Sequence, residues 1–165
     1  MKMIDVGAKP KTERVAIARG RIVMLPETVA RILRGDVEKG DVLAACRLAG
    51  VLAAKHTPDI VPLCHPIALS NIEVEATPGP DGVEVVATVK TVDRTGVEME
   101  ALAAVMAALL TIYDMLKRYE HGMVIERVEL AKKDGGRTGL WLREGEKPAA
   151  PARKPRAAAP AKRRR

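Results

Sequence analysis

The chain has 165 residues, of which 47% are hydrophobic but only 2% aromatic, and its formal net charge is +7. This length predicts one domain, residues 1–147, with an aliphatic core, and so few aromatic rings argue against a stacking platform for single-stranded nucleic acid. Residues 148–165 hold seven of the 28 Lys and Arg and no acid, which leaves a formally neutral body and predicts a disordered Ala/Pro/basic tail.

The first elements are a strand and a short helix. Apolar side chains alternate along residues 14–24, which predicts a half-buried strand with a bulge or turn at Gly20. Pro26 suits the first position of a helix, and Gly35 suits its end.

A second helix is predicted from its cap at Asp41 to about Lys55, with a narrow face of small side chains that can pack closely. Prolines then recur through residues 57–66. Because each lacks an amide hydrogen and disfavours helix in the preceding residue, we expect this segment to be extended and irregular.

The second half of the chain predicts a hairpin, a long helix and two further strands. Residues 72–77 and 83–91 alternate around a Pro- and Gly-rich turn, and residues 98–119 form the longest helix, ended by Gly122. Its expected buried side consists of Leu102, Val105, Met106, Leu109, Ile112, Tyr113 and Leu116. Residues 123–132 and 139–143 complete an α+β fold, joined by a glycine-rich loop suited to positive φ or to a bound ligand.

Three local patterns carry candidate chemistry, and each has a structural alternative. Lys39 precedes the Asp41 helix start, where it could join free amides in binding phosphate or simply be solvated. His65, between two prolines, is oriented for proton transfer. Glu98 and Glu100 could divide acid and base roles or only complement the helix dipole.

Asp114 and Lys117 are neighbours on one helix face. The structural alternative is a surface ion pair, but both residues border the apolar stripe. A partly buried ammonium there would have a lowered pKa and could exchange protons.

The two cysteines, Cys46 and Cys64, form no CxxC pair, and no signal peptide is recognisable. The longest apolar stretch is shorter than the ~20 residues of a membrane span. We therefore expect reduced thiols, no bound metal or cofactor, and a soluble cytoplasmic protein.

The sequence also lacks Walker A, GxGxxG, HExxH and GxSxG motifs. A nucleic-acid-binding protein or a ligand-sensing domain remain the alternatives to an enzyme.

Four long segments, however, resemble the cyclic pyranopterin monophosphate synthase family. They are MIDVGAKPKTERVAIARG, KGDVLAACRLAGVLAAKHTPDIVPLCHPIALSNIEVE, TGVEMEALAAVMAALLTIYDMLK and AKKDGGRTG. The resemblance implies a ferredoxin-like α+β subunit in a homohexamer of three dimers, with sites at the dimer interface. It also implies molybdenum cofactor biosynthesis: a lyase that converts (8S)-3′,8-cyclo-7,8-dihydroguanosine 5′-triphosphate, supplied by a radical SAM GTP cyclase, into cyclic pyranopterin monophosphate and pyrophosphate.

The resemblance also assigns site residues. Lys39, Asp114 and Lys117 match catalytic positions of the family. The substrate-binding candidates are Asp5, Lys9, Leu63, Cys64, His65, Glu98, Met99, Glu100 and Lys133, to which we add Arg14 as a phosphate ligand.

Overall fold

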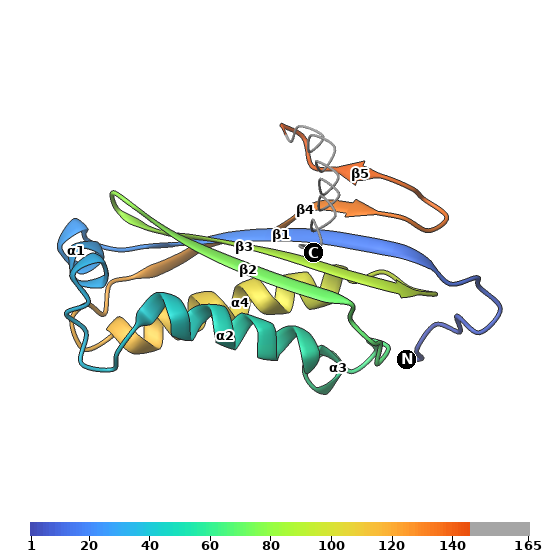
Figure 1. The fold of residues 1–165 in the computed structure, drawn as a ribbon, viewed down its shortest axis with the longest axis horizontal. Helices are drawn as coiled ribbons and strands as arrows, with labels where there is room; N and C mark the ends of the chain where they lie inside the picture. The colour runs from blue at the N-terminus through green and yellow to red at the C-terminus, as the bar shows by residue number, and fades with distance from the viewer. Residues whose placement is uncertain (146–165) are drawn as a thin grey trace, which may run out of the picture.

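The computed structural model describes residues 1–145, which form one antiparallel sheet and four helices (Figure 1). The sheet order is β2-β3-β1-β4-β5. Two βαβ-type units with this order give the ferredoxin-like α+β arrangement, which confirms the predicted fold class. In chain order the elements are β1 (Thr12–Val23), α1 (Pro26–Arg34), α2 (Val42–Lys55), α3 (Thr57–Ile60), β2 (Asn71–Gly79), β3 (Gly82–Asp93), α4 (Glu98–Leu116), β4 (Val124–Asp134) and β5 (Trp141–Leu142).

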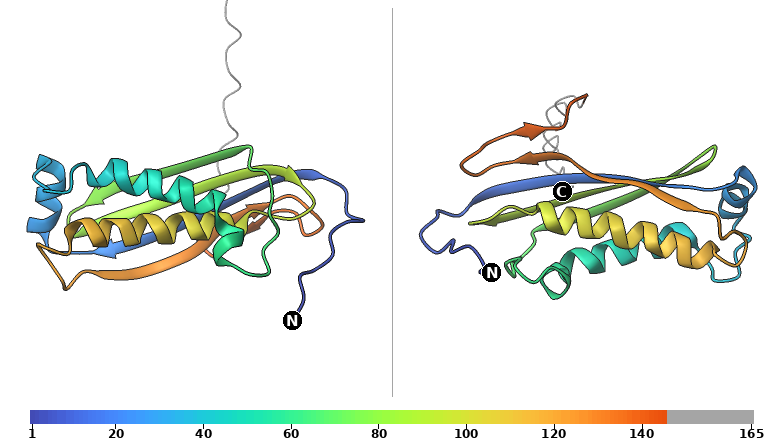
Figure 2. Two further views of the ribbon diagram at one scale, coloured as in Figure 1. Left: turned by 90° about the horizontal axis from the view of Figure 1, so that it is seen from below. Right: turned by 180° about the vertical axis from the view of Figure 1, so that it is seen from behind.

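Helices α2 and α4 cover one face of the sheet, and the core lies between these two layers (Figure 2). The inward-facing side chains of β1 and β3 alternate with outward ones, as the period-two pattern predicted. Helix α4 is apolar and long enough by composition to span a membrane, but half of its apolar stretch is buried. That burial is what a core helix of an α+β domain shows.

Gly20 permits the close approach of α4 to the sheet. The turn or bulge predicted there is wrong, because β1 pairs with β3 without a break on both sides of Gly20. A Cβ atom at Gly20 would lie 2.6 Å from the Arg127 carbonyl oxygen and 2.7 Å from Leu109 and Val105. The glycine therefore serves packing, and the irregularities in the pairing with β4 fall on either side of it.

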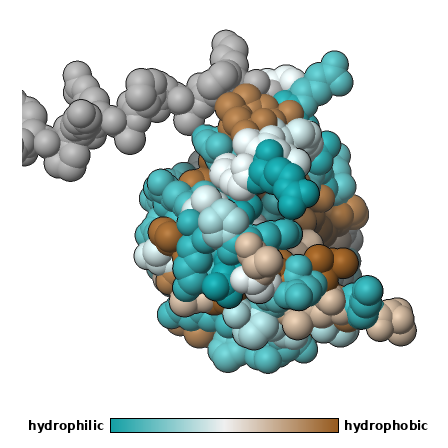
Figure 3. Space-filling view, turned by 90° about the vertical axis from the view of Figure 1, so that its right-hand side faces the viewer, coloured by the Kyte–Doolittle hydropathy of each residue, from teal (hydrophilic) through white to brown (hydrophobic). Residues whose placement is uncertain are grey.

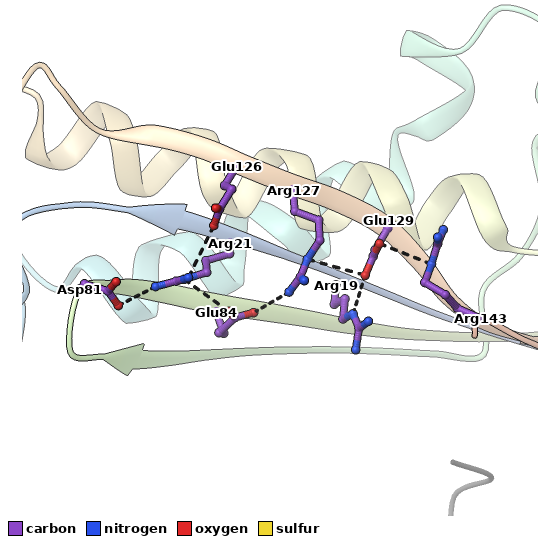
Figure 4. A network of polar contacts seen from close by, with 8 residues as sticks. All are labelled: Arg19, Arg21, Asp81, Glu84, Glu126, Arg127, Glu129 and Arg143. Atoms are coloured by element: carbon purple, nitrogen blue, oxygen red, sulfur yellow. Dashed lines mark hydrogen bonds and ion pairs between the residues drawn. The ribbon is translucent and has the colours of Figure 1, made fainter. Parts of the chain in front are cut away.

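The opposite face of the sheet carries a network of alternating charges (Figure 4). Arg19 pairs with Glu129 at 2.8 Å, and Arg21 pairs with Asp81 at 2.5 Å. Arg127 bridges the two groups through Glu84 and Glu129, and Arg143 and Glu126 complete the network. Cross-strand pairs of opposite charge on this face stabilise the pairing of β1, β3 and β4.

Several predicted boundaries are confirmed. Helix α1 ends at Gly35, whose φ of 68° is left-handed, and Asp41 caps α2 by accepting a hydrogen bond from the Ala44 amide at 2.9 Å. The hairpin of β2 and β3 closes with Gly79 opposite Gly82. Three glycines of the loop after β4 have positive φ, as expected: Gly135, Gly136 and Gly139.

Other predictions are corrected. The proline-rich segment is not wholly irregular, because Thr57–Ile60 form the single turn α3 with Pro58 at its start, where no amide hydrogen is required. Helix α4 ends at Leu116, three residues before the predicted end, and Gly122 does not cap it. Met106 is 58% exposed rather than buried. The predicted tail, 148–165, lies outside the residues that the structure describes.

Candidate functional site

A charged cluster lies at the C-terminal end of α4. Lys39 comes from the loop between α1 and α2, whereas Asp114 and Lys117 are adjacent on the last turn of the helix and just after it. The Lys39 ammonium donates to Asp114 Oδ2 at 2.6 Å and to the Asp114 carbonyl oxygen at 3.0 Å. The Lys117 ammonium pairs with Asp114 Oδ1 at 2.7 Å. Each carboxylate oxygen thus has its own lysine partner.

These contacts hold Asp114 ionised. Hydrogen bonds from Lys117 and Lys39 lower the pKa of Asp114 to about 2, and the Asp114 carboxylate raises the pKa of Lys117. The lowered lysine pKa expected from the sequence is therefore wrong for this state, because the Lys117 side chain is about half exposed and its nearest charge is opposite. The cluster presents two ammonium groups on a partly open surface.

A second cluster surrounds a pocket of about 330 Å³ at the other end of α4. The proline-rich segment supplies one wall and the first turn of α4 supplies another. Six of the predicted substrate-binding residues line it: Lys9, Leu63, Cys64, His65, Glu98 and Met99. The His65 Nε2 atom lies 2.8 Å from the Ile4 carbonyl oxygen, so the N-terminal segment closes one side of the pocket.

Glu100 lies behind this pocket and is only 2% exposed. The Cys64 thiol donates to its Oε1 atom at 3.4 Å, and its Oε2 atom is buried without a hydrogen-bond partner among residues 1–145. Burial raises the pKa of Glu100. Burial and the adjacent Glu100 raise the pKa of Cys64 to about 11, which keeps the thiol protonated and weakly nucleophilic.

A larger pocket of about 600 Å³ adjoins the first and shares Lys9 with it. Three arginines line it: Arg14, Arg94 and Arg137. The Arg14 guanidinium donates to the Arg94 carbonyl oxygen at 3.3 Å, while its buried Nε has no partner within residues 1–145. Convergent guanidinium and ammonium groups of this kind suit an anionic ligand such as phosphate.

The glycine-rich loop after β4 forms one side of this basic pocket. Gly136 lies against the Arg14 guanidinium, which would have to move if a side chain were added there, and its φ of 74° favours glycine. Lys133 does not line the pocket but hydrogen-bonds Thr138, which does. Hydrophilic residues predominate on this end of the molecule (Figure 3).

The structure thus brings most of the predicted residues together, but in two groups. Asp5 lines neither pocket, although its neighbours Ile4 and Val6 line the smaller one, and its carboxylate accepts a hydrogen bond from the Gly7 amide at 2.8 Å. The sequence left phosphate binding through Arg137 open but gave Arg94 no role; the available signal was a basic residue near a loop glycine, since Arg137 follows Gly136 and Arg94 lies two residues before Gly96. Fourteen residues of continuous helix separate Glu100 from Asp114, about 21 Å at ~1.5 Å per residue.

Comparison with known proteins identifies close relatives. Residues 3–136 match the model of the MoaC family. The chain is 52% identical over 145 residues to the cyclic pyranopterin monophosphate synthase of Thermomicrobium roseum, covering 87% of each chain. It is 54% identical over 140 residues to the protein of the same name from Novosphingobium aromaticivorans, covering 85% of this chain and 89% of the relative.

Proposed function

Because the chain belongs to the MoaC family, we propose that it is a cyclic pyranopterin monophosphate synthase, a lyase of molybdenum cofactor biosynthesis. Its substrate is (8S)-3′,8-cyclo-7,8-dihydroguanosine 5′-triphosphate, and its products are cyclic pyranopterin monophosphate and pyrophosphate. The observation that carries the proposal is the extent of the similarity, above half identity over more than four fifths of the chain. A radical SAM GTP cyclase supplies the substrate, and the reaction takes place in the cytoplasm.

The proposed reaction needs proton transfers and an anion site, and the two clusters offer these separately. Lys39, Asp114 and Lys117 form the catalytic group, in which the ammonium groups donate and the carboxylate can accept protons once a ligand displaces the ion pairs. Expulsion of pyrophosphate develops negative charge, which lysine and arginine stabilise.

We assign the basic pocket to the triphosphate and the adjoining smaller pocket to the ring system. Lys9 and Arg14 bind phosphate oxygens together with Arg94 and Arg137, and Lys133 supports the same loop. The smaller pocket, lined by Leu63, Cys64, His65, Glu98 and Met99, is adjacent, and its polar side chains can hydrogen-bond the edges of a purine-derived ring. Glu100 supports this pocket through Cys64.

Two subunits are needed to complete one site in this proposal. An apolar stripe runs along the exposed side of α4, where Met99, Met106 and Leu110 are 41%, 58% and 62% exposed at spacings of seven and four residues. This spacing repeats on one helix face, as in helices that pair. An antiparallel two-fold pairing of α4 would place Asp114 of one subunit beside the Glu100 end of its partner. Three such dimers form the proposed homohexamer.

The activity is tested by incubating the purified protein with the cyclised triphosphate and detecting pyrophosphate and the cyclic pterin. We expect both products in equal amounts. If neither forms although the protein is folded and binds the triphosphate, the chain is a ligand-binding domain rather than this enzyme.

The shared site has its own test. Glu100→Gln and Asp114→Asn subunits, each expected to be inactive alone, are mixed and allowed to exchange. If each site takes Glu100 from one subunit and Asp114 from the other, a mixed dimer contains one site with both wild-type residues, and activity returns. Mass spectrometry verifies the exchange. Exchanged but inactive mixtures would refute the arrangement, and a mixture of two Asp114→Asn preparations serves as the negative control.

A further inference from the structure

The loop that carries Lys39 is held against the end of α4 by the residues that follow the helix. Lys39 can reach Asp114 only while this loop, residues 36–41, keeps its position. The Tyr119 hydroxyl accepts a hydrogen bond from the Glu38 amide at 2.9 Å. The Arg118 guanidinium also pairs with the Glu38 carboxylate. Glu38, which makes the first contact through its amide and the second through its side chain, immediately precedes Lys39.

Tyr119 is itself fixed in place. Its amide donates to the Leu116 carbonyl oxygen at 2.8 Å, which continues the end of α4. The Arg31 guanidinium lies over its ring, 4.8 Å from the centroid, and pairs with Asp36 at 2.9 Å. The Tyr119 hydroxyl is thus held between the end of α4 and the loop, where it can accept the hydrogen bond, and Arg31 of α1 helps to hold it there.

We propose that Tyr119 is a positioning residue for Lys39: by accepting the Glu38 amide it fixes the loop so that the Lys39 ammonium meets Asp114. The effect of Tyr119 on turnover rests on the proposed function, because only in that function does Lys39 take part in a reaction. The placement of Lys39 against Asp114 can be measured without any turnover.

Tyr113, the only other tyrosine in the sequence, provides a matched control. Its hydroxyl also bonds a backbone group, donating to the His121 carbonyl oxygen at 3.0 Å, but that group does not belong to the Lys39 loop. Tyr119→Phe and Tyr113→Phe each remove one hydroxyl and keep the ring. A general loss of packing or stability should therefore be similar in the two variants.

The first measurement is the titration of the Asp114 carboxyl by carbon NMR in the wild type, both tyrosine variants and Lys39→Ala. Among residues 1–145 the cations paired with Asp114 are Lys39 from the loop and Lys117 from its own helix. Weakening the Lys39 contact leaves Lys117 and should raise the pKa of Asp114 from about 2. We expect Tyr119→Phe to shift it in the same direction as Lys39→Ala but less, and Tyr113→Phe to leave it unchanged.

The second measurement is steady-state kinetics. Loss of one hydrogen bond predicts a kcat about fivefold lower for Tyr119→Phe with KM nearly unchanged, and no such change for Tyr113→Phe. An unchanged Asp114 titration in Tyr119→Phe would overturn the positioning role whatever the activity. A shifted titration supports that role, and if turnover nevertheless persists in both Tyr119→Phe and Lys39→Ala, it is the catalytic assignment of Lys39 that fails.

Discussion

Replacing Gly20 with alanine tests whether the contact between β1 and α4 is as tight as the structure shows. The added methyl group would meet a backbone oxygen at 2.6 Å and two core side chains at 2.7 Å. A backbone oxygen cannot move aside as a side-chain end can, so either the strand or the helix must shift. Overpacking of this kind costs about 1–3 kcal/mol, and three simultaneous contacts favour the upper end.

Part of this cost is offset, because alanine loses less backbone entropy than glycine on folding, about 0.5–1 kcal/mol in a strand. The expected net loss is therefore about 2 kcal/mol of unfolding free energy for Gly20→Ala. Urea denaturation followed by far-UV circular dichroism, at one protein concentration for all variants, measures it.

Two other glycines provide controls of graded tightness. At Gly50 a Cβ atom would lie 3.0 Å from the Ala104 carbonyl oxygen and 3.1 Å from Val74, while the gain in helix propensity is about 1 kcal/mol. Gly50→Ala should therefore fall within about 1 kcal/mol of the wild type. Gly122 has open space around it, so Gly122→Ala should be neutral or slightly stabilising. Equal stability of Gly20→Ala and Gly122→Ala would refute the packing explanation.

Three further predictions concern the site and the tail. Lys39→Ala and Lys117→Ala should lose nearly all turnover while melting at close to the wild-type temperature. Lys117→Arg should also be inactive, because a guanidinium does not release its proton. Loss of the oligomer in these variants would instead mean that the lysines have a structural role. Burial raises the pKa of Glu100 in the folded protein, so between the ordinary and the raised pKa the folded protein binds a proton that the unfolded chain releases. The contribution of Glu100 to stability is therefore fully present below the ordinary glutamate pKa, and it is lost as pH rises through the raised pKa. Glu100→Gln should accordingly be more stable than the wild type at neutral pH, by a margin that shrinks in acid denaturation series. Removal of residues 148–165 should change neither activity nor melting temperature, and a fall of several degrees would show that the segment docks on the domain.

Much of the fold could be predicted because local signals agree with the packing. The cap at Asp41, the left-handed Gly35 and the Pro- and Gly-rich hairpin turn each determine an element boundary through backbone chemistry alone. Pro58 was misleading because proline disrupts the interior of a helix but is tolerated in its first turn. Which of the two applies depends on where the helix begins, and the sequence does not show this.

The errors on α4 have a different cause. By spacing and hydrophobicity, Met106 is as good a candidate for the buried side of α4 as Ala104 and Ala108. The two alanines are the residues that are buried. Periodicity does not show how closely α2 packs against α4, where a Cβ atom at Gly50 would lie 3.0 Å from the Ala104 carbonyl oxygen. The same limit applies to Lys117: spacing predicted its pairing with Asp114, but its exposure, and hence the direction of its pKa shift, depends on the surrounding surface.

Helix α4 fixes the angle about its axis between Glu100 and Asp114 as well as the distance between them. It contains neither proline nor glycine, and 14 residues at 3.6 per turn place Glu100 and Asp114 about 3.9 turns apart. Deleting one residue between them would rotate one end by about 100° relative to the other and remove the apolar stripe from a single face. Insertions and deletions within the helix should therefore not be tolerated, because either would break the alignment of its two ends.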